Sequence, residues 1–209
     1  MSAPTDTFTH ANMTVKIFQD ETPPNPREEF NNLGTMLCFH KRYNLGDSTS
    51  KSRLYKTVPK IDHGDYSSWA EMEAAIVRDH DAAVVLPLYL YDHSGITMST
   101  GPHGCRFDSG QVGFIYCTKR TILNEYTVGG QPRKRLSKQV LQKVRECLES
   151  EVKTYDDYLT GNVYGFVVED AQGEESASCW GFYGIEDARE AGKEQAGYSS
   201  TEELVGAAR

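Results

Sequence analysis

The chain has 209 residues, of which 38% are hydrophobic and 11% aromatic, and a net charge of −8 at pH 7. This length is sufficient for one well-buried core. No apolar run approaches the roughly 18 residues that a membrane-spanning helix requires. The first ten residues, MSAPTDTFTH, lack the basic start and apolar segment of a secretory signal. The five cysteines form neither a CxxC motif nor a disulfide framework, so reduced thiols in a cytoplasm are expected.

The charge is distributed unevenly along the chain. Residues 41–60 contain six Lys or Arg and one Asp, and residues 119–145 contain eight Lys or Arg and one Glu. From residue 146 onward there are fifteen acidic and four basic residues. These blocks are compatible with charges that are solvated or paired within the fold, and also with a surface that faces phosphate groups.

The first third of the chain contains few strong signals of secondary structure. Residues 1–30 are polar and rich in proline, which predicts a loose arm around one short strand at 13–18. Alternating polarity predicts a strand at 35–43, and a basic surface loop is expected at 46–66. A capping box at Ser68, followed three residues later by a glutamate, predicts a short helix.

The middle of the chain is predicted to form three strands. The continuous apolar run at 82–91 predicts a strand covered on both faces. Pro87 within it indicates a bulge or a position near the sheet edge, because proline cannot donate to the ladder. Further strands are expected at 96–100 and 111–118.

Apolar residues recur at helical spacing from Ser137 to Leu159, which predicts the longest helix of the chain. Two strands are expected at 162–169 and 176–182, joined by an acidic turn. A short helix is expected near 185–194.

Taken together, these elements predict an α+β fold with a single, largely antiparallel sheet, one long helix packed across a face and one or two short helices. The expected domains are a loose arm at 1–30, a single α+β domain at 31–184, and a short helix with an acidic, small-residue tail at 185–209.

The segment 91–110 carries most of the residues that could perform chemistry, because polar groups at the end of a buried strand are held rigidly yet reach solvent. The candidate catalytic residues share the segment with one histidine from an earlier strand: His40, Asp92, His93, Ser94, Cys105, Asp108 and Ser109. Asp92 cannot easily orient His93, since neighbouring strand residues point to opposite faces. The alternative interpretation is turn architecture, in which Asp and Ser bond to nearby backbone groups.

Two further sites are conceivable from residue types. One possible site is for zinc, whose ligands would be the cysteine and histidine of Cys38-Phe39-His40 and of His103-Gly104-Cys105. The two tripeptides carry these residues in opposite order, and known zinc sites favour other spacings. The alternative is a buried thiol and a satisfied histidine.

The basic segment before the long helix could hold an anion or a nucleic-acid backbone at the helix N-terminus, through Arg133, Lys134 and Arg135. An exposed basic hinge is the alternative. No nucleotide-binding or nucleic-acid-binding motif is present, and no cofactor is expected.

Four segments together resemble a family of small proteins found in phage genomes and prophages: NNLGTMLCFHKRYNLGD, LPLYLYDHSGITMS, FDSGQVGFIY and CWGFYG. The resemblance covers roughly residues 26–184. It implies a protein made by a mobile element and active in the host cytoplasm, and it carries no catalytic role to any residue.

The leading hypothesis is therefore an accessory protein that binds a host macromolecule, a host protein first and a nucleic acid or nucleotide second, and that inhibits a defence system. The alternatives are a small hydrolase or transferase using the 91–110 segment, and a zinc-stabilised binding domain. No membrane partner is expected, and the sequence predicts no oligomeric state.

Overall fold

The chain folds into two compact units, which are described separately. The computed structural model describes residues 3–47, 61–104, 108–127, 130–132 and 134–207, with side chains of the last helix described as far as Ser199. The first unit combines Met1–Pro24 with Asp157–Arg209, and the second comprises Asn25–Asp156. This division differs from the expected arm, domain and tail, because both ends of the chain belong to one unit.

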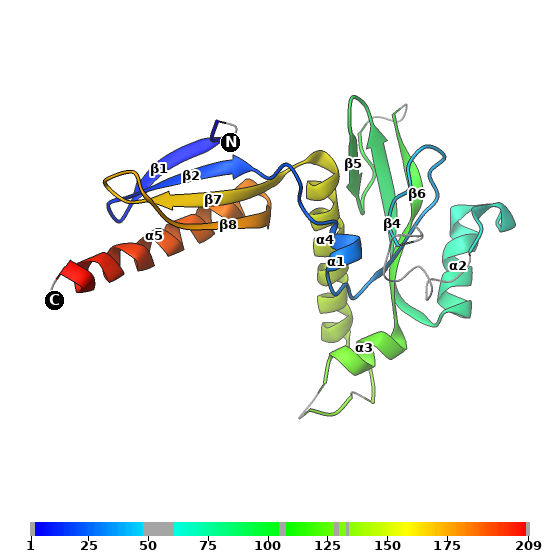
Figure 1. Ribbon diagram of the computed structural model, residues 1–209. Coiled ribbons are helices and arrows are strands. Elements are labelled where there is room, and N and C mark those ends of the chain that lie inside the picture. Colours follow the sequence, from blue (N-terminus) through cyan, green and yellow to red (C-terminus); the bar gives the residue numbers. More distant parts are fainter. Residues whose placement is uncertain (1–2, 48–60, 105–107, 128–129, 133, 208–209) are drawn as a thin grey trace. The chain divides into compact units, whose positions relative to one another are not determined.

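The first unit is a four-stranded antiparallel sheet with strand order β1-β2-β7-β8. Its strands are β1 (Asp6–His10), β2 (Met13–Gln19), β7 (Val163–Glu169) and β8 (Glu175–Tyr183). Helix α5 (Ile185–Ala207) lies along one face of this sheet, as Figure 1 shows. The buried core between them is apolar: Met13, Val15, Ile17, Phe166, Val168, Ala188 and Ala196.

The expectation of a loose N-terminal arm was wrong, because β1 and β2 form a hairpin within this sheet. Its two turn residues, Ala11 and Asn12, have φ angles of +49° and +62°. Two consecutive left-handed residues match the twist of the flanking strands, so they favour a tight hairpin turn. The strand expected at 13–18 is confirmed as β2.

The second unit contains another four-stranded antiparallel sheet, with strand order β3-β6-β4-β5. Its strands are β3 (Thr35–Cys38), β4 (Ala82–Asp92), β5 (Ile96–Ser99) and β6 (Ser109–Thr118). The strand expected at 35–43 thus ends early, at Cys38. Pro87 lies in the part of β4 that pairs with β6 alone, because β5 pairs only from Tyr89 onward.

Helices pack on both faces of this second sheet. Helix α2 (Trp69–Asp79) follows the capping residue Ser68, as predicted, and packs Met72 and Ile76 against Phe114. Helix α4 (Lys138–Thr160) confirms the predicted long helix. Its Leu148 lies so close to Gly34 that a Cβ added at Gly34 would be 2.5 Å from the Leu148 Cδ2.

The remaining helices are short: α1 (Pro26–Glu29), the 3-10 turn η1 (His63–Asp65) and α3 (Lys119–Glu125). The α+β class is confirmed, but the single sheet is wrong, since the described residues form two. The expected short last helix is also wrong, because α5 continues to Ala207.

Candidate functional site

A depression of about 360 Å³ opens at one end of the sheet in the second unit. Apolar and polar residues line it, and they come from β4, β6 with the residue before it, and the segment after β3: His40, Arg42, Leu90, Asp92, Asp108, Ser109, Gly110 and Val112. Four of the seven candidate catalytic residues predicted from the sequence therefore line one surface. Arg42, which no sequence pattern indicated as a site residue, lines the same depression.

Strand pairing explains why the acidic residues meet here. Strand β4 ends at Asp92 and β6 begins at Ser109, and the two strands are antiparallel neighbours, with Tyr91 opposite Ser109. The backbone N–H of Asp92 donates to the carbonyl of Asp108 at 2.9 Å. Since both carboxylates emerge where one strand ends and its neighbour begins, they share the end of the sheet.

Asp92 forms an ion pair with Arg42 across this end of the sheet. The Arg42 side chain is 68% exposed and that of Asp92 21%. The Tyr43 hydroxyl lies 3.5 Å from the other Asp92 oxygen, and the Arg42 guanidinium carbon lies 5.5 Å from the centre of the Tyr43 ring. An exposed pair of this kind stabilises the fold little, so Arg42 can exchange Asp92 for a carboxylate or phosphate of a partner.

His40 organises the segment that follows β3. Its Nδ1 accepts hydrogen bonds from the backbone N–H groups of Arg42 and Tyr43, both at 3.3 Å. Its ring stacks on Tyr43, with centroids 4.9 Å apart and an angle of 11° between the planes. Because Nδ1 accepts, the neutral ring carries its proton on Nε2. His40 therefore acts as a turn-forming residue that presents an N–H donor.

His93 is paired with Asp108 and not with Asp92. Its Nδ1 lies 3.5 Å from Asp108 Oδ2, and the two side chains are 65% and 40% exposed. The prediction that Asp92 does not orient His93 agrees with this geometry. Ser94 lies in the turn that follows, with a φ of +54°, and its Oγ donates to the His93 carbonyl at 2.7 Å. Because that proton is engaged locally, Ser94 is a turn residue in this structure and not a nucleophile beside a base.

His103 contacts Ser99 in a way that resembles a serine–histidine pair. Its Nε2 lies 3.1 Å from Ser99 Oγ, but that hydroxyl donates its single proton to the carbonyl of Gly101 at 2.6 Å. The histidine must then be the donor, so it does not activate the serine. The rings of His103 and His93 lie 5.8 and 6.0 Å from the ring of Tyr91, which makes a small aromatic cluster.

The described residues of the hypothetical zinc site do not converge. Cys38 is buried, and burial together with the charge of Asp47 raises the pKa of its thiol to about 12. The other predicted cysteine, Cys105, lies outside the described residues. Among the residues that the structure describes, no three His, Cys, Asp or Glu side chains are arranged to hold a metal ion.

The basic segment before α4 is only partly described, since Arg133 lies outside the described residues. Lys134 and Arg135 are exposed. Ser137 caps the helix, and its Oγ accepts a hydrogen bond from the Val140 N–H at 3.3 Å. Because this serine already serves one of the free N–H groups of the helix start, the anion site predicted here gains no support from the geometry.

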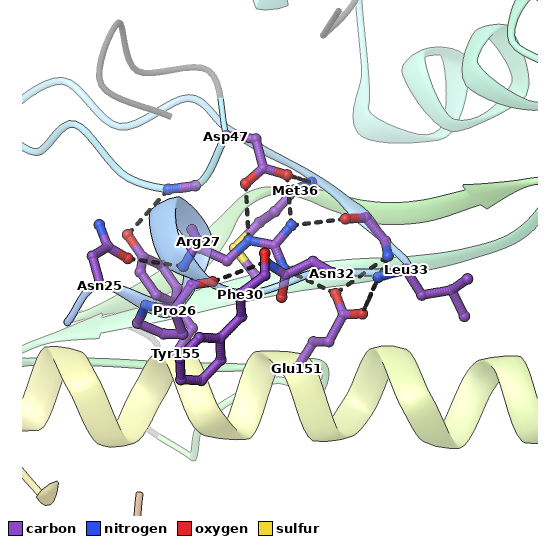
Figure 2. A network of polar contacts seen from close by, with 12 residues as sticks. Asn25, Pro26, Arg27, Phe30, Asn32, Leu33, Met36, Asp47, Glu151 and Tyr155 are labelled. Carbon is purple, nitrogen blue, oxygen red and sulfur yellow. Dashed lines mark hydrogen bonds and ion pairs between the residues drawn. The ribbon is translucent and has the colours of Figure 1, made fainter. Parts of the chain in front are cut away.

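A buried ionic network holds the segment that carries His40 and Arg42, and Figure 2 shows it from close by. The Arg27 side chain is 1% exposed and forms a two-pronged contact with Asp47, through bonds of 2.8 and 2.6 Å. Arg27 also donates to Glu151 of α4 at 2.8 Å and to the Gly34 carbonyl at 2.7 Å. Burial alone would lower the pKa of Arg27, but Asp47 and Glu151 raise it above its ordinary value.

The two carboxylates of this network also hold backbone groups. Asp47 accepts from the Met36 N–H at 2.7 Å, and Glu151 accepts from the Leu33 N–H at 2.6 Å. The Gly46 N–H donates to the Tyr155 hydroxyl at 3.1 Å. Hydrogen bonds therefore hold the chain at both ends of the segment between β3 and Asp47. No local sequence pattern signals this network, because its members lie 20 and 124 residues apart.

Comparison with known proteins gives no match among family models, curated proteins or solved structures. Within the described part of the chain, no helix has the length and apolar character needed to cross a membrane.

Proposed function

We propose that this chain is a binding protein, encoded by a phage or prophage, that recognises a host protein and inhibits a defence system. Its recognition surface is the end of the second unit's sheet, here called the strand-end surface and defined by Arg42, Tyr43, Tyr91, His93 and His103. The observation that carries the proposal is that two groups of exposed or half-buried side chains lie at the same end of this sheet: Arg42 and Tyr43 beside Asp92, and His93 and His103 around Tyr91.

Residue type and exposure support recognition at this surface. Arginine and tyrosine are the types that most often dominate binding energy at protein interfaces. Arg42 and His93 are each more than half exposed, while Tyr91 and Tyr43 are half-buried. Half-buried rings lose little conformational freedom on binding, because the fold already restrains them. A partner that offers a carboxylate could pair with Arg42 in exchange for Asp92.

Two serine hydroxyls and one thiol of this unit favour binding over catalysis. Ser94 and Ser99 each donate their proton to a nearby carbonyl, at 2.7 and 2.6 Å. The thiol of Cys38 has its pKa raised to about 12 by burial, so almost none of it is the reactive thiolate at neutral pH. These three groups are therefore poor nucleophiles as they stand.

Site-specific photo-crosslinking tests the proposal. A photoreactive amino acid replaces Lys41, beside the strand-end surface, and as a control replaces Gln142 on α4 of the same unit. Both positions are exposed. In bacterial lysate we expect one host protein to crosslink at position 41 and not at 142. Arg42→Ala should weaken that capture at least about tenfold, as expected for an interface arginine, and Arg145→Ala on α4 should not. Equal crosslinking from both positions would contradict the proposal.

The counter-defence role has its own test. The chain is expressed in bacteria that carry a defence system, and the plating efficiency of a sensitive phage is measured. We expect plating to rise with the wild-type chain and to fall back with Arg42→Ala. If capture of the host protein depends on Arg42 but plating does not change, the binding role stands and the counter-defence role is wrong.

A second candidate is a small hydrolase, which the 3.5 Å contact between His93 and Asp108 beside the depression favours. It predicts turnover of simple ester or phosphate substrates that His93→Ala abolishes. Turnover that survives in His93→Ala would point to a contaminant.

A further inference from the structure

Strand β8 forms one outer edge of the sheet in the first unit, since the strand order is β1-β2-β7-β8 and, among the residues that the structure describes, β8 pairs only with β7. It has nine residues, and most of those from Glu175 to Trp180 are exposed. An edge strand presents unpaired N–H and C=O groups on its outer side, which can pair with an added strand.

The hydrogen-bond pattern of β2, β7 and β8 determines which peptide groups of β8 point outward. The Asp20 N–H donates to the Val163 carbonyl at 2.8 Å, so Val163 presents its peptide groups to β2. Peptide groups alternate sides along a strand, so Gly165 also presents them to β2. Trp180 lies opposite Gly165 in the register of β7 and β8, and the peptide groups of Trp180 therefore point outward. The same alternation directs those of Ser178, two residues earlier, outward.

An aromatic side chain stands beside this open edge. The Trp180 side chain is 45% exposed, and its ring lies 6.2 Å from that of Phe18. It covers Gly165 so closely that a Cβ there would lie 2.3 Å from the indole. A ring fixed on the sheet and half open to solvent offers apolar area to an added strand at low entropic cost.

The chain segment that contains the edge strand is acidic. Residues 169–194 contain eight Asp or Glu and two Lys or Arg, and one of the acids, Glu169, pairs with Lys16 of β2 at 2.6 Å. Both bases are engaged within the unit, since Arg189 pairs with Asp6 at 2.8 Å and the Lys193 ammonium lies 5.6 Å from the centre of the Phe8 ring. A second copy of this chain would bring like charges together here, whereas a cationic strand would find complementary charge.

We propose that the outer edge of β8 binds an extended, basic segment of a partner protein by strand addition. Main-chain hydrogen bonds to Ser178 and Trp180 supply affinity, the indole receives an apolar side chain, and the acidic surroundings select lysine or arginine. This surface belongs to the first unit and is independent of the strand-end surface of the second.

The probe is a seven-residue peptide that alternates lysine with valine, and its matched control alternates glutamate with valine. Fluorescence anisotropy of each labelled peptide is measured against the full chain. Ser178→Pro removes an outward N–H, whereas Ser178→Ala removes the same hydroxyl but keeps the N–H. Thermal unfolding establishes that both variants fold. Hydrogen exchange reads the protection of the Ser178 and Trp180 amides directly.

We expect the lysine peptide to bind the wild type and Ser178→Ala equally and Ser178→Pro at least about tenfold more weakly, as the loss of a main-chain hydrogen bond together with steric interference implies. The Ser178 and Trp180 amides should gain protection only with that peptide. Four results would overturn the proposal: no binding of the lysine peptide, equal binding to both variants, equal binding of the glutamate peptide, or a dimer of the chain that protects these amides by itself.

Discussion

Replacing Arg27 by methionine should destabilise the second unit strongly. The side chain is 1% exposed, and the Asp47 carboxylate that it contacts is fully buried. Methionine keeps most of the aliphatic volume but removes the guanidinium donors, so Asp47 is left with the hydrogen bond from the Met36 N–H. Removing one partner of a buried ion pair costs about 3–5 kcal/mol, because the other charge is left without compensation. We expect a loss of that size in the free energy of unfolding.

Urea denaturation measures this loss, with tryptophan fluorescence as the signal. The chain has two tryptophans, and each unit contains one, Trp69 in the second and Trp180 in the first. A Trp180→Phe background therefore reports the second unit alone. Arg78→Met is the matched control, since Arg78 is 70% exposed and its ion pair with Asp79 lies at the surface. An exposed pair contributes little, so the control should unfold as the wild type does.

A double variant separates the charge from the packing. Asp47→Asn added to Arg27→Met removes the unpaired buried charge while keeping the shape of the side chain. It should be more stable than Arg27→Met alone, because a neutral amide costs less to bury than a carboxylate. If Arg27→Met were no less stable than Arg78→Met, the network would not hold this unit together and the reasoning would be refuted.

Three further outcomes are expected. At pH 8 iodoacetamide should modify the exposed Cys179 and leave Cys38 intact in the native chain, because burial raises the pKa of the Cys38 thiol to about 12. Mass spectrometry of the digested protein measures the modification of each cysteine, and modification of Cys38 in preference to Cys179 would contradict the prediction. Gly113→Ala should lower the free energy of unfolding by about 3 kcal/mol or more, because a Cβ at this position would lie 1.8 Å from a β3 carbonyl oxygen. Gly101→Ala places its Cβ in open space and should leave the melting temperature unchanged. Hydrogen bonds from the serine four residues earlier hold the pKa of Glu71 below its ordinary value. This carboxylate therefore stabilises the fold above its unfolded-state pKa, and the contribution is lost as pH falls through the lower folded pKa. Glu71→Gln should flatten the fall in stability over that acidic range, and an unchanged profile of unfolding free energy against pH would contradict it.

Local signals in the sequence predicted the elements that depend on local physics. The capping residue Ser68 and the helical apolar spacing of α4 fixed two helices to within a residue of their starts. The hairpin turn at Ala11 and Asn12 was missed because only Asn12 is a common left-handed residue. The single-sheet prediction failed because β2 pairs with β7, some 150 residues later, and alternation within a strand does not identify its neighbour.

The candidate site was predicted in part for the same reason. Asp92, Asp108 and Ser109 flank strands that the apolar pattern located, so their proximity followed once β4 and β6 paired. Arg42 was not selected, although the strand expected at 35–43 contained it together with His40. Its role depends on a turn after Cys38, and the hydrogen bonds that make this turn are accepted by a histidine nitrogen. No standard turn pattern includes that contact.

The buried network and the strand-end surface are physically connected through one short stretch of chain. The Phe39 N–H donates to the Val112 carbonyl at 2.7 Å, and the Asp47 N–H donates to the Met36 carbonyl at 2.8 Å, so the stretch between them is closed at both ends. Arg42 is held on this stretch although it is itself exposed. A surface whose backbone is fixed before binding loses less entropy when a partner arrives. Loss of Arg27 should therefore weaken recognition through Arg42 without any contact between Arg27 and the partner.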